Sequence, residues 1–200
     1  YVSSGSYEYE KGNSLVRDRI YINDGSGKFI IGGKDALPDN LDNGSVVCGA
    51  DFDRDGDSDL FVGSRVVSGE YPVGPQSRLL VNESLKGQNI RFVEAPSEIS
   101  GNLINSGMVT SALWTDVNND GWSDLMVTAE WEPIRVYINE GGKLSDKTSE
   151  FGLSKMKGWW NSINGADIDN DGDIDYLVGN AGQNTNCLLY TSPSPRDSRK

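Results

Sequence analysis

The sequence predicts an all-β fold made of repeated four-stranded antiparallel units, and three observations lead to this prediction. Glycine accounts for 24 of the 200 residues, which indicates many tight turns. Short apolar runs suited to strands alternate with acidic, glycine-containing loops, and the same order of features recurs three times. Helical spacing of apolar residues is not convincing anywhere. An apolar content of 36% is sufficient for a lean core.

The most specific part of the repeat is a nine-residue acidic loop at residues 51–59, 116–124 and 167–175. The loops read DFDRDGDSD, DVNNDGWSD and DIDNDGDID, and each is followed at once by an apolar run: LFVG, LMVT or YLVG. A further run ends in Asn and an acid, at residues 21–24, 80–83 and 137–140. Because these Asn residues are 59 and 57 positions apart, the unit is near sixty residues, enough for about four short strands.

Four-stranded antiparallel units repeated around an axis form the blades of a β-propeller, which leaves only short sheet edges. In the second unit we expect strands at 46–52, 60–66, 78–82 and 90–94, separated by turns rich in Gly, Pro and Ser. Residues 1–5 (YVSSG) match a strand of an earlier unit. We therefore expect a partial propeller over residues 1–186, with part of one blade, two full blades and part of a fourth, and further blades outside this chain. Tandem sandwich domains are the alternative, although sixty residues is short for one.

The acidic loops have the ligand pattern of a calcium site. Ca²⁺ prefers about six to eight oxygen ligands, and alternate residues of a tight loop turn carboxylates towards one point. Glycine at position six, Gly56, Gly121 or Gly172, permits the sharp turn. The sequence predicts about three Ca²⁺ ions, one per loop, held by side chains at positions one, three, five and nine and by the carbonyl of position seven. These residues are Asp51, Asp53, Asp55, Asp57 and Asp59; Asp116, Asn118, Asp120, Trp122 and Asp124; and Asp167, Asp169, Asp171, Asp173 and Asp175.

Two other interpretations of the loops are open. An EF-hand or dockerin loop begins similarly, but it needs an acid or an equivalent ligand at position twelve and a following helix, whereas Val62, Val127 and Val178 stand there. Solvated acidic turns are the second alternative, but clustering four carboxylates without a counter-ion is unfavourable. Mg²⁺ is less suited to such a flexible loop. We expect the second loop to bind most weakly, because Asn118 leaves it three carboxylates instead of four.

Composition excludes several classes of function. The net charge of -12 repels nucleic acids and offers no basic patch to an anionic membrane, and no apolar run is long enough for a membrane span. Histidine is absent, which removes the usual general base and the commonest transition-metal ligand. Cys48 and Cys187 lie far apart with no CxxC motif, so we expect small buried hydrophobes, with a disulfide as the less favoured alternative.

Five tryptophans are candidates either for packing or for stacking on sugar rings: Trp114, Trp122, Trp131, Trp159 and Trp160. We expect core or inter-blade packing for most of them. Trp122 and the Trp159/Trp160 pair, beside loops, are the better binding candidates. Glu130 and Glu132 flank Trp131 in the manner of a paired-carboxylate glycosidase, but alternate residues of a strand share a face, so spacing alone creates such pairs. No catalytic residue is predicted.

The three loops and the strands after them resemble the FG-GAP or VCBS repeat family, whose blades carry a D-x-D-x-D-G-x-x-D-[LY] calcium loop, as in integrin α-chain propellers. The resemblance covers residues 1–186. Segments such as GMVTSALWTDVNNDGWSDLMV are similar to large secreted bacterial VCBS proteins, some related to the cartilage-acidic-protein group.

The resemblance implies a non-catalytic calcium-binding module for adhesion or scaffolding, located outside the cell or on its surface, with a protein or glycan ligand. The alternative is the propeller part of a secreted polysaccharide-acting enzyme, such as a lyase, or a lectin. Residues 187–200 (CLLYTSPSPRDSRK) break the repeat. We expect an unstructured, non-native tail there, with a natural flexible linker as the alternative.

Overall fold

Antiparallel β-sheets are the main regular structure of the computed structural model, which describes residues 1–6, 8–86 and 89–181. One four-stranded sheet contains β3 (Asn43–Ala50), β4 (Asp59–Val66), β5 (Arg78–Asn82) and β6 (Phe92–Glu94), in sequence order. The same hairpin succession recurs in β7 (Met108–Thr115), β8 (Asp124–Pro133), β9 (Arg135–Asn139) and β10 (Leu144–Asp146). One two-stranded hairpin, β1 (Tyr21–Asn23) with β2 (Phe29–Ile31), precedes these units. A second, β11 (Lys157–Ala166) with β12 (Asp175–Asn180), follows them and joins the sheet of β8 through β11.

The prediction of an all-β fold with four-stranded antiparallel units is therefore confirmed. Within the second unit, four strand boundaries were wrong: the first strand begins at Asn43 and the second at Asp59. The first strand ends at Ala50, because Phe52 already belongs to the acidic loop, and the last begins at Phe92. Helical structure in the described residues is limited to η1 (Ser14–Val16), α1 (Ser97–Ser100) and η2 (Gly101–Asn105), and the last two connect β6 to β7. The predicted boundary at residue 186 and the tail after it lie outside the described residues.

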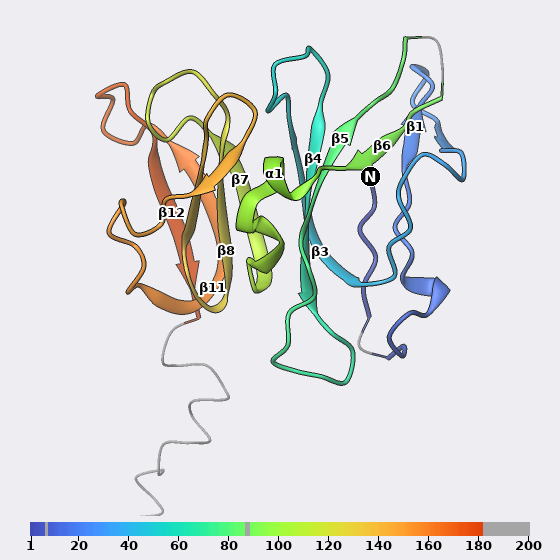
Figure 1. The fold of residues 1–200 in the computed structure, drawn as a ribbon, viewed down its shortest axis with the longest axis horizontal. Helices are drawn as coiled ribbons and strands as arrows, with labels where there is room; N and C mark the ends of the chain where they lie inside the picture. Colours follow the sequence, from blue (N-terminus) through green and yellow to red (C-terminus); the bar gives the residue numbers. More distant parts are fainter. Residues whose placement is uncertain (7, 87–88, 182–200) are drawn as a thin grey trace, which may run out of the picture.

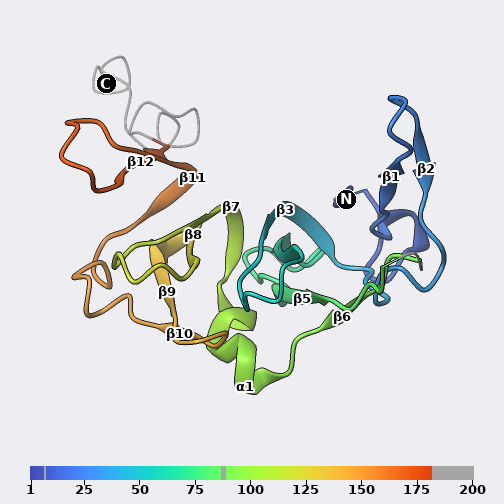
Figure 2. The same cartoon turned by 90° about the horizontal axis from the view of Figure 1, so that it is seen from above.

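The sheets lie side by side in a radial arrangement (Figures 1 and 2). Seen from above, β3 and β7, the first strands of the two four-stranded units, lie side by side at the inner edge, and β11 follows β7. The last strands, β6 and β10, lie with α1 at the outer rim (Figure 2). This radial order of strands is that of a partial propeller.

Each complete blade is apolar on both faces, because successive side chains of a strand point to opposite sides. In β8, Leu125 and Val127 enter the core shared with the preceding blade, whereas Met126 enters the core shared with β11 and β12. In β4, Phe61 faces the following blade and Val62 the N-terminal segment. The continuous apolar runs of the repeat are thus explained by burial on both sides.

Neighbouring blades are also joined near their inner edges. Phe52, buried although it lies in a loop, stacks on Trp114 with ring centroids 6.2 Å apart. The indole N–H of Trp114 donates to the Cys48 carbonyl at 3.2 Å, and Cys48 packs, partly buried, against the same core. Trp114 therefore has the inter-blade packing role expected for most of the tryptophans, and Cys187 lies outside the described residues.

A second junction lies at the opposite end of the strands. The last residues of β8 run past the end of β7 and pair with β11, with Glu130 opposite Trp159 and Pro133 opposite Lys157. A similar backbone contact joins the N-terminal residues to the blade that begins with β3. There the Gly44 N–H donates to the Ser4 carbonyl at 3.0 Å. The start of a blade's first strand is thus hydrogen-bonded to the preceding blade, and the rest of the strand pairs within its own blade.

The asparagine that marks each repeat has a structural role that the sequence left unassigned. The Asn139 side chain is fully buried, donates to the Phe52 carbonyl of the preceding blade at 2.7 Å and to the Ser123 carbonyl at 3.0 Å, and accepts from the Gly142 N–H at 2.8 Å. Asn82 makes the equivalent bonds within its own blade, to Ser58 and Ser84. Asn139 is therefore a polar tie between two blades.

Replacing Asn139 by Ala should lower the free energy of unfolding by about 2 to 3 kcal/mol, because the buried partners of its amide are left without a bond. Asn82→Ala is the matched control, since its bonds are more exposed and stay within one blade, and about 1 kcal/mol is expected. Urea unfolding followed by tryptophan fluorescence measures both. Equal losses in the two variants would contradict a role for Asn139 between blades.

Candidate metal centre

The three acidic loops occupy equivalent positions at one end of the blades. Each joins the first and second strands of its sheet: β3 to β4, β7 to β8, and β11 to β12. In Figure 1 all three lie at the upper end of the sheets. Since strands flank every loop on both sides, the EF-hand and dockerin interpretation is wrong.

The loops share one hydrogen-bond pattern, which explains why their sequences match. The carboxylate at position one accepts from the glycine N–H at position six, at 3.2 Å from Gly56, 2.7 Å from Gly121 and 3.1 Å from Gly172. Position three accepts from the N–H of position five, and position five from that of position seven, in all three loops. The alternate acids therefore shape the loop through their own backbone before any ion is considered.

Two positions in each loop adopt a left-handed backbone. Gly56, Gly121 and Gly172 have φ of 97°, 84° and 97°, as the sixth-position glycine predicted. Position four, occupied by Arg54, Asn119 and Asn170, also has positive φ, between 57° and 63°. The two asparagines tolerate this region well, and they were the available signal in the sequence.

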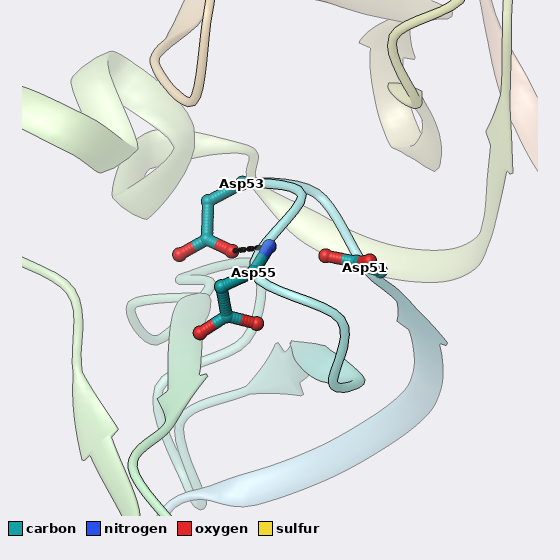
Figure 3. A group of neighbouring side chains, drawn as sticks. All are labelled: Asp51, Asp53 and Asp55. Atoms are coloured by element: carbon teal, nitrogen blue, oxygen red, sulfur yellow. Dashed lines mark hydrogen bonds between the residues drawn. The ribbon is translucent and has the colours of Figure 1, made fainter.

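Carboxylate oxygens converge in two of the loops. One oxygen from each of Asp51, Asp53 and Asp55 lies within 4.8 Å of the others, and Figure 3 shows the side chains gathered around the turn. In the third loop the converging residues are Asp167, Asp169 and Asp175. Among the described residues, the second loop forms no such group of three acids. The position-seven carbonyls of Asp57, Trp122 and Asp173 stay predicted ligands.

The first loop has the chemistry that a divalent cation requires. Asp51 Oδ1 and Asp57 Oδ1 are shielded from solvent and have no hydrogen-bond partner in the described part of the chain. Burial raises the pKa of Asp53 and of Asp57, and neighbouring carboxylates, Asp55 and Asp51, raise both further. Unsatisfied acceptors together with crowded negative charge fit a bound cation, since oxygen-rich sites are what Ca²⁺ prefers.

The second loop uses part of its ligand set internally. The amide of Asn118 donates to Asp120 Oδ2 at 2.9 Å, and Asp120 Oδ1 also accepts from the Trp122 N–H at 2.7 Å. The Trp122 N–H bond and then the Asn118 bond lower the pKa of Asp120, so this carboxylate is already stabilised as an anion. Among the described residues, the side-chain bond between positions three and five occurs in the second loop alone.

The ninth aspartate closes each loop and ties it to its sheet. Asp59 and Asp124 are completely buried and accept from the N–H at position two of their loop, Phe52 or Val117. Their other oxygens accept from the N–H of Asn82 at 2.9 Å and of Asn139 at 2.7 Å, on the third strand. Asp175 makes the bond to position two through Ile168. Position nine is therefore a structural anchor as well as a predicted ligand.

Neighbouring loops contact one another through position four, which the sequence did not suggest. The guanidinium of Arg54 lies 3.9 Å from the ring centroid of Trp122, in the next loop. The amide of Asn119 then donates to Asp173 Oδ1, in the third loop, at 2.7 Å. The three candidate sites thus form a connected row.

The other candidate residues, the tryptophans and the Glu130/Glu132 pair, do not form one site with the acidic loops. Trp160 packs, partly buried, against the core between β8 and β12, and its N–H donates to the Glu132 carbonyl, so it has a packing role. Trp159 and Trp131 lie at the end of the blades away from the acidic loops. Glu130 forms an ion pair with Arg65, and Glu132 with Arg135. Both carboxylates of the glycosidase-like pair are thus held by arginines, which supports the interpretation that spacing alone created the pair.

The metal-free protein should lose stability as pH rises from about 4 to about 7. Burial raises the pKa of Asp59 from 3.8 to about 6, and Asp53 and Asp55 add to this against the opposing Asn82 N–H. The folded state therefore binds more protons than the unfolded state in this window, so ionisation above it is unfavourable.

Urea unfolding at several pH values with a chelator measures this dependence. Asp59→Asn should make the slope between pH 5 and 7 shallower. Asp24→Asn is the control, because the Ser26 hydroxyl lowers the pKa of exposed Asp24, whose charge is constant across that window. An unchanged slope in Asp59→Asn would contradict the assignment.

Comparison with known protein families gives a family match, which covers all three acidic loops. The FG-GAP-like repeat matches residues 6–62 and 116–178, which together are more than half of the chain. The two matched stretches include the first acidic loop and the second and third. Repeats of this kind are generally non-catalytic interaction modules. Within the described residues, no helix is both long and apolar enough to cross a membrane. The chain belongs to the FG-GAP-like repeat family.

Proposed function

We propose that this chain is a calcium-stabilised interaction module that acts outside the cell or on its surface, in adhesion or scaffolding. The observation that carries the proposal is the convergence of Asp51, Asp53 and Asp55, and of Asp167, Asp169 and Asp175, in equivalent nine-residue loops. A bound cation would neutralise carboxylates that otherwise repel one another at the end of each blade.

Calcium suits these loops better than other metals. Their candidate ligands are carboxylate, amide and carbonyl oxygens, and no histidine exists in the chain to favour a transition metal. The ion would be held by positions one, three, five, seven and nine, and it would supply fixed positive charge, not chemistry. Position nine would pass this stabilisation to the third strand of the blade through Asn82 or Asn139.

An extracellular location is consistent with the exposure of the loops. The residues of the third loop are exposed, and the sites form from single hairpins instead of enclosed cages. Extracellular calcium modules work at dissociation constants of about 10⁻⁴ to 10⁻³ M, which such open sites can reach. Calcium outside cells would keep them filled, so the ions would act as permanent structural parts.

Calcium should raise the melting temperature, and a chelator should reverse the effect. At a hundredfold excess over its dissociation constant, an ion adds about 2.7 kcal/mol per site. The double change Asp53→Asn and Asp55→Asn should remove roughly the calcium stabilisation that one site contributes, because it leaves loops two and three intact. Differential scanning calorimetry with calcium, magnesium or chelator makes the measurement. An identical melting temperature with calcium and with chelator would defeat the proposal.

Asn118→Asp should strengthen the second site on the order of tenfold, because it restores a fourth carboxylate and removes the Asn118 to Asp120 hydrogen bond. Terbium, a luminescent substitute for calcium, reports this loop through energy transfer from Trp122. The same titration in a Trp122→Phe background identifies the signal of the second loop. If wild-type loop two fills before the other loops, the predicted order of affinity is wrong.

A further inference from the structure

An aromatic cluster lies at the end of the blades opposite the acidic loops. We call Tyr71, Trp131 and Trp159 the aromatic platform. Pairing of β8 with β11 sets Glu130 opposite Trp159, and Trp131 is the next residue of β8. The two indole rings have centroids 5.3 Å apart and are tilted by 34°. Tyr71 comes from the β4–β5 loop, so two blades and the start of a third contribute to the platform.

The platform is held in one orientation although much of it is exposed. The Trp131 N–H donates to the Tyr71 hydroxyl at 3.0 Å, and this hydroxyl donates to Glu130 Oε2 at 3.4 Å. Trp131 and Tyr71 are 50% and 57% exposed. Trp131 also has φ of 65°, a left-handed conformation that is unusual for a bulky residue. Backbone strain of this kind clusters at functional sites, and core packing does not explain it here.

The charges beside the platform are already balanced. Glu130, nearly buried, pairs with Arg65 at 2.5 Å, and Glu132 pairs with Arg135 at 3.0 Å. A ligand would therefore meet neutral pairs that both donate and accept hydrogen bonds. This environment favours a neutral polar ligand over an ion.

Unused donors lie in the same region. In the described part of the chain, Trp159 Nε1 and Arg65 Nε are shielded from solvent and have no acceptor. Arg65 also lines a cavity of about 260 Å³ together with Ser6, Asn43, Ser45 and Thr110. The cavity is small and polar, and Arg65 connects it to the platform. Unpaired buried donors are rare in proteins, and a partner from outside the chain would explain them.

These properties select a carbohydrate among ligands that stack on aromatic rings. A methylammonium cage needs a gap between its rings, and the 5.3 Å separation leaves none. A single-stranded nucleic acid also stacks on aromatic side chains, but its phosphates meet a chain of net charge -12. A proline-rich peptide offers mainly carbonyl acceptors, which match the donors here but not the carboxylate acceptors of Glu130 and Glu132. A sugar ring presents apolar C–H faces to indoles, and its hydroxyls match a rim of donors and acceptors.

We propose that the aromatic platform, with Arg65 and Glu130 at its rim, binds a neutral glycan. This inference rests on the proposed interaction-module function and names the class of ligand. The platform and the acidic loops lie at opposite ends of the same strands. Glycan binding and calcium-dependent stabilisation can therefore be tested separately in one protein.

The test is affinity electrophoresis of the complete chain, with calcium present, in gels containing galactomannan, xyloglucan, mixed-linkage β-glucan or dextran. At least one polysaccharide should retard the wild type. Trp131→Ala and Trp159→Ala should weaken that retardation tenfold or more, and Trp131→Phe should weaken it less. Trp122→Ala is the matched control, because it removes a partly buried tryptophan at the other end of the blades. Melting with calcium and with chelator establishes that each variant is folded.

The outcomes separate the two proposals. Retardation that is lost in the platform variants and kept in Trp122→Ala supports the glycan site. No retardation by any of the four polysaccharides, with the calcium-dependent melting shift intact, overturns the glycan site alone. Binding of poly-uridine or of a proline-rich peptide through Trp131, in place of a polysaccharide, also overturns it. Absence of the calcium shift counts against the proposed function, whatever the gels show.

Discussion

Burial of both faces of each complete blade is the constraint on which the rest of this structure depends. A strand such as β8 sends Leu125 and Val127 to one side and Met126 to the other, and all three are buried. A single blade of this kind would expose one or both apolar faces to water, so it needs a neighbour on each side. Repetition follows from this need. At the inner edge, Phe52 stacks on Trp114 and joins two neighbouring blades.

The two ends of the blades meet different physical requirements. At one end the chain turns sharply from the first strand to the second, and aspartates supply the acceptors that the turning backbone needs. Their cost is burial of carboxylates and, after it, mutual repulsion, and both raise the pKa of Asp53, Asp57 and Asp59. At the other end β8 is long enough to pair with β11, and its charged side chains are neutralised in pairs. One end therefore concentrates charge, while the other presents exposed aromatic surface.

Much of the fold could be predicted because the copies of the repeat can be aligned with one another within this one sequence. Three copies of an acidic loop followed by an apolar run located the first two strands of each blade, and the Asn-acid pairs located the third. The loop residues were found because an alternating pattern is a local property. Phe52 was misplaced because burial inside a loop depends on Trp114 of the next blade.

The contacts between repeats could not be predicted in the same way. Asn139 and Asn82 look alike in sequence, yet only Asn139 reaches a neighbouring blade, to the Phe52 carbonyl. The Arg54 contact with Trp122 and the meeting of Trp131 with Trp159 likewise join residues of different units. Periodicity identifies what the units share, whereas these contacts depend on how two units are set against each other.

The ninth aspartate also limits how such a chain can change during evolution. Asp59 is bonded both to the loop before it and to Asn82 on the third strand, and Asp124 repeats this with Asn139. A gene duplication that broke between these points would copy a turn without its anchor. Viable breakpoints are thus confined to the stretches between blades, such as the one carrying α1 and η2. The unit of inheritance is the whole blade together with its loop.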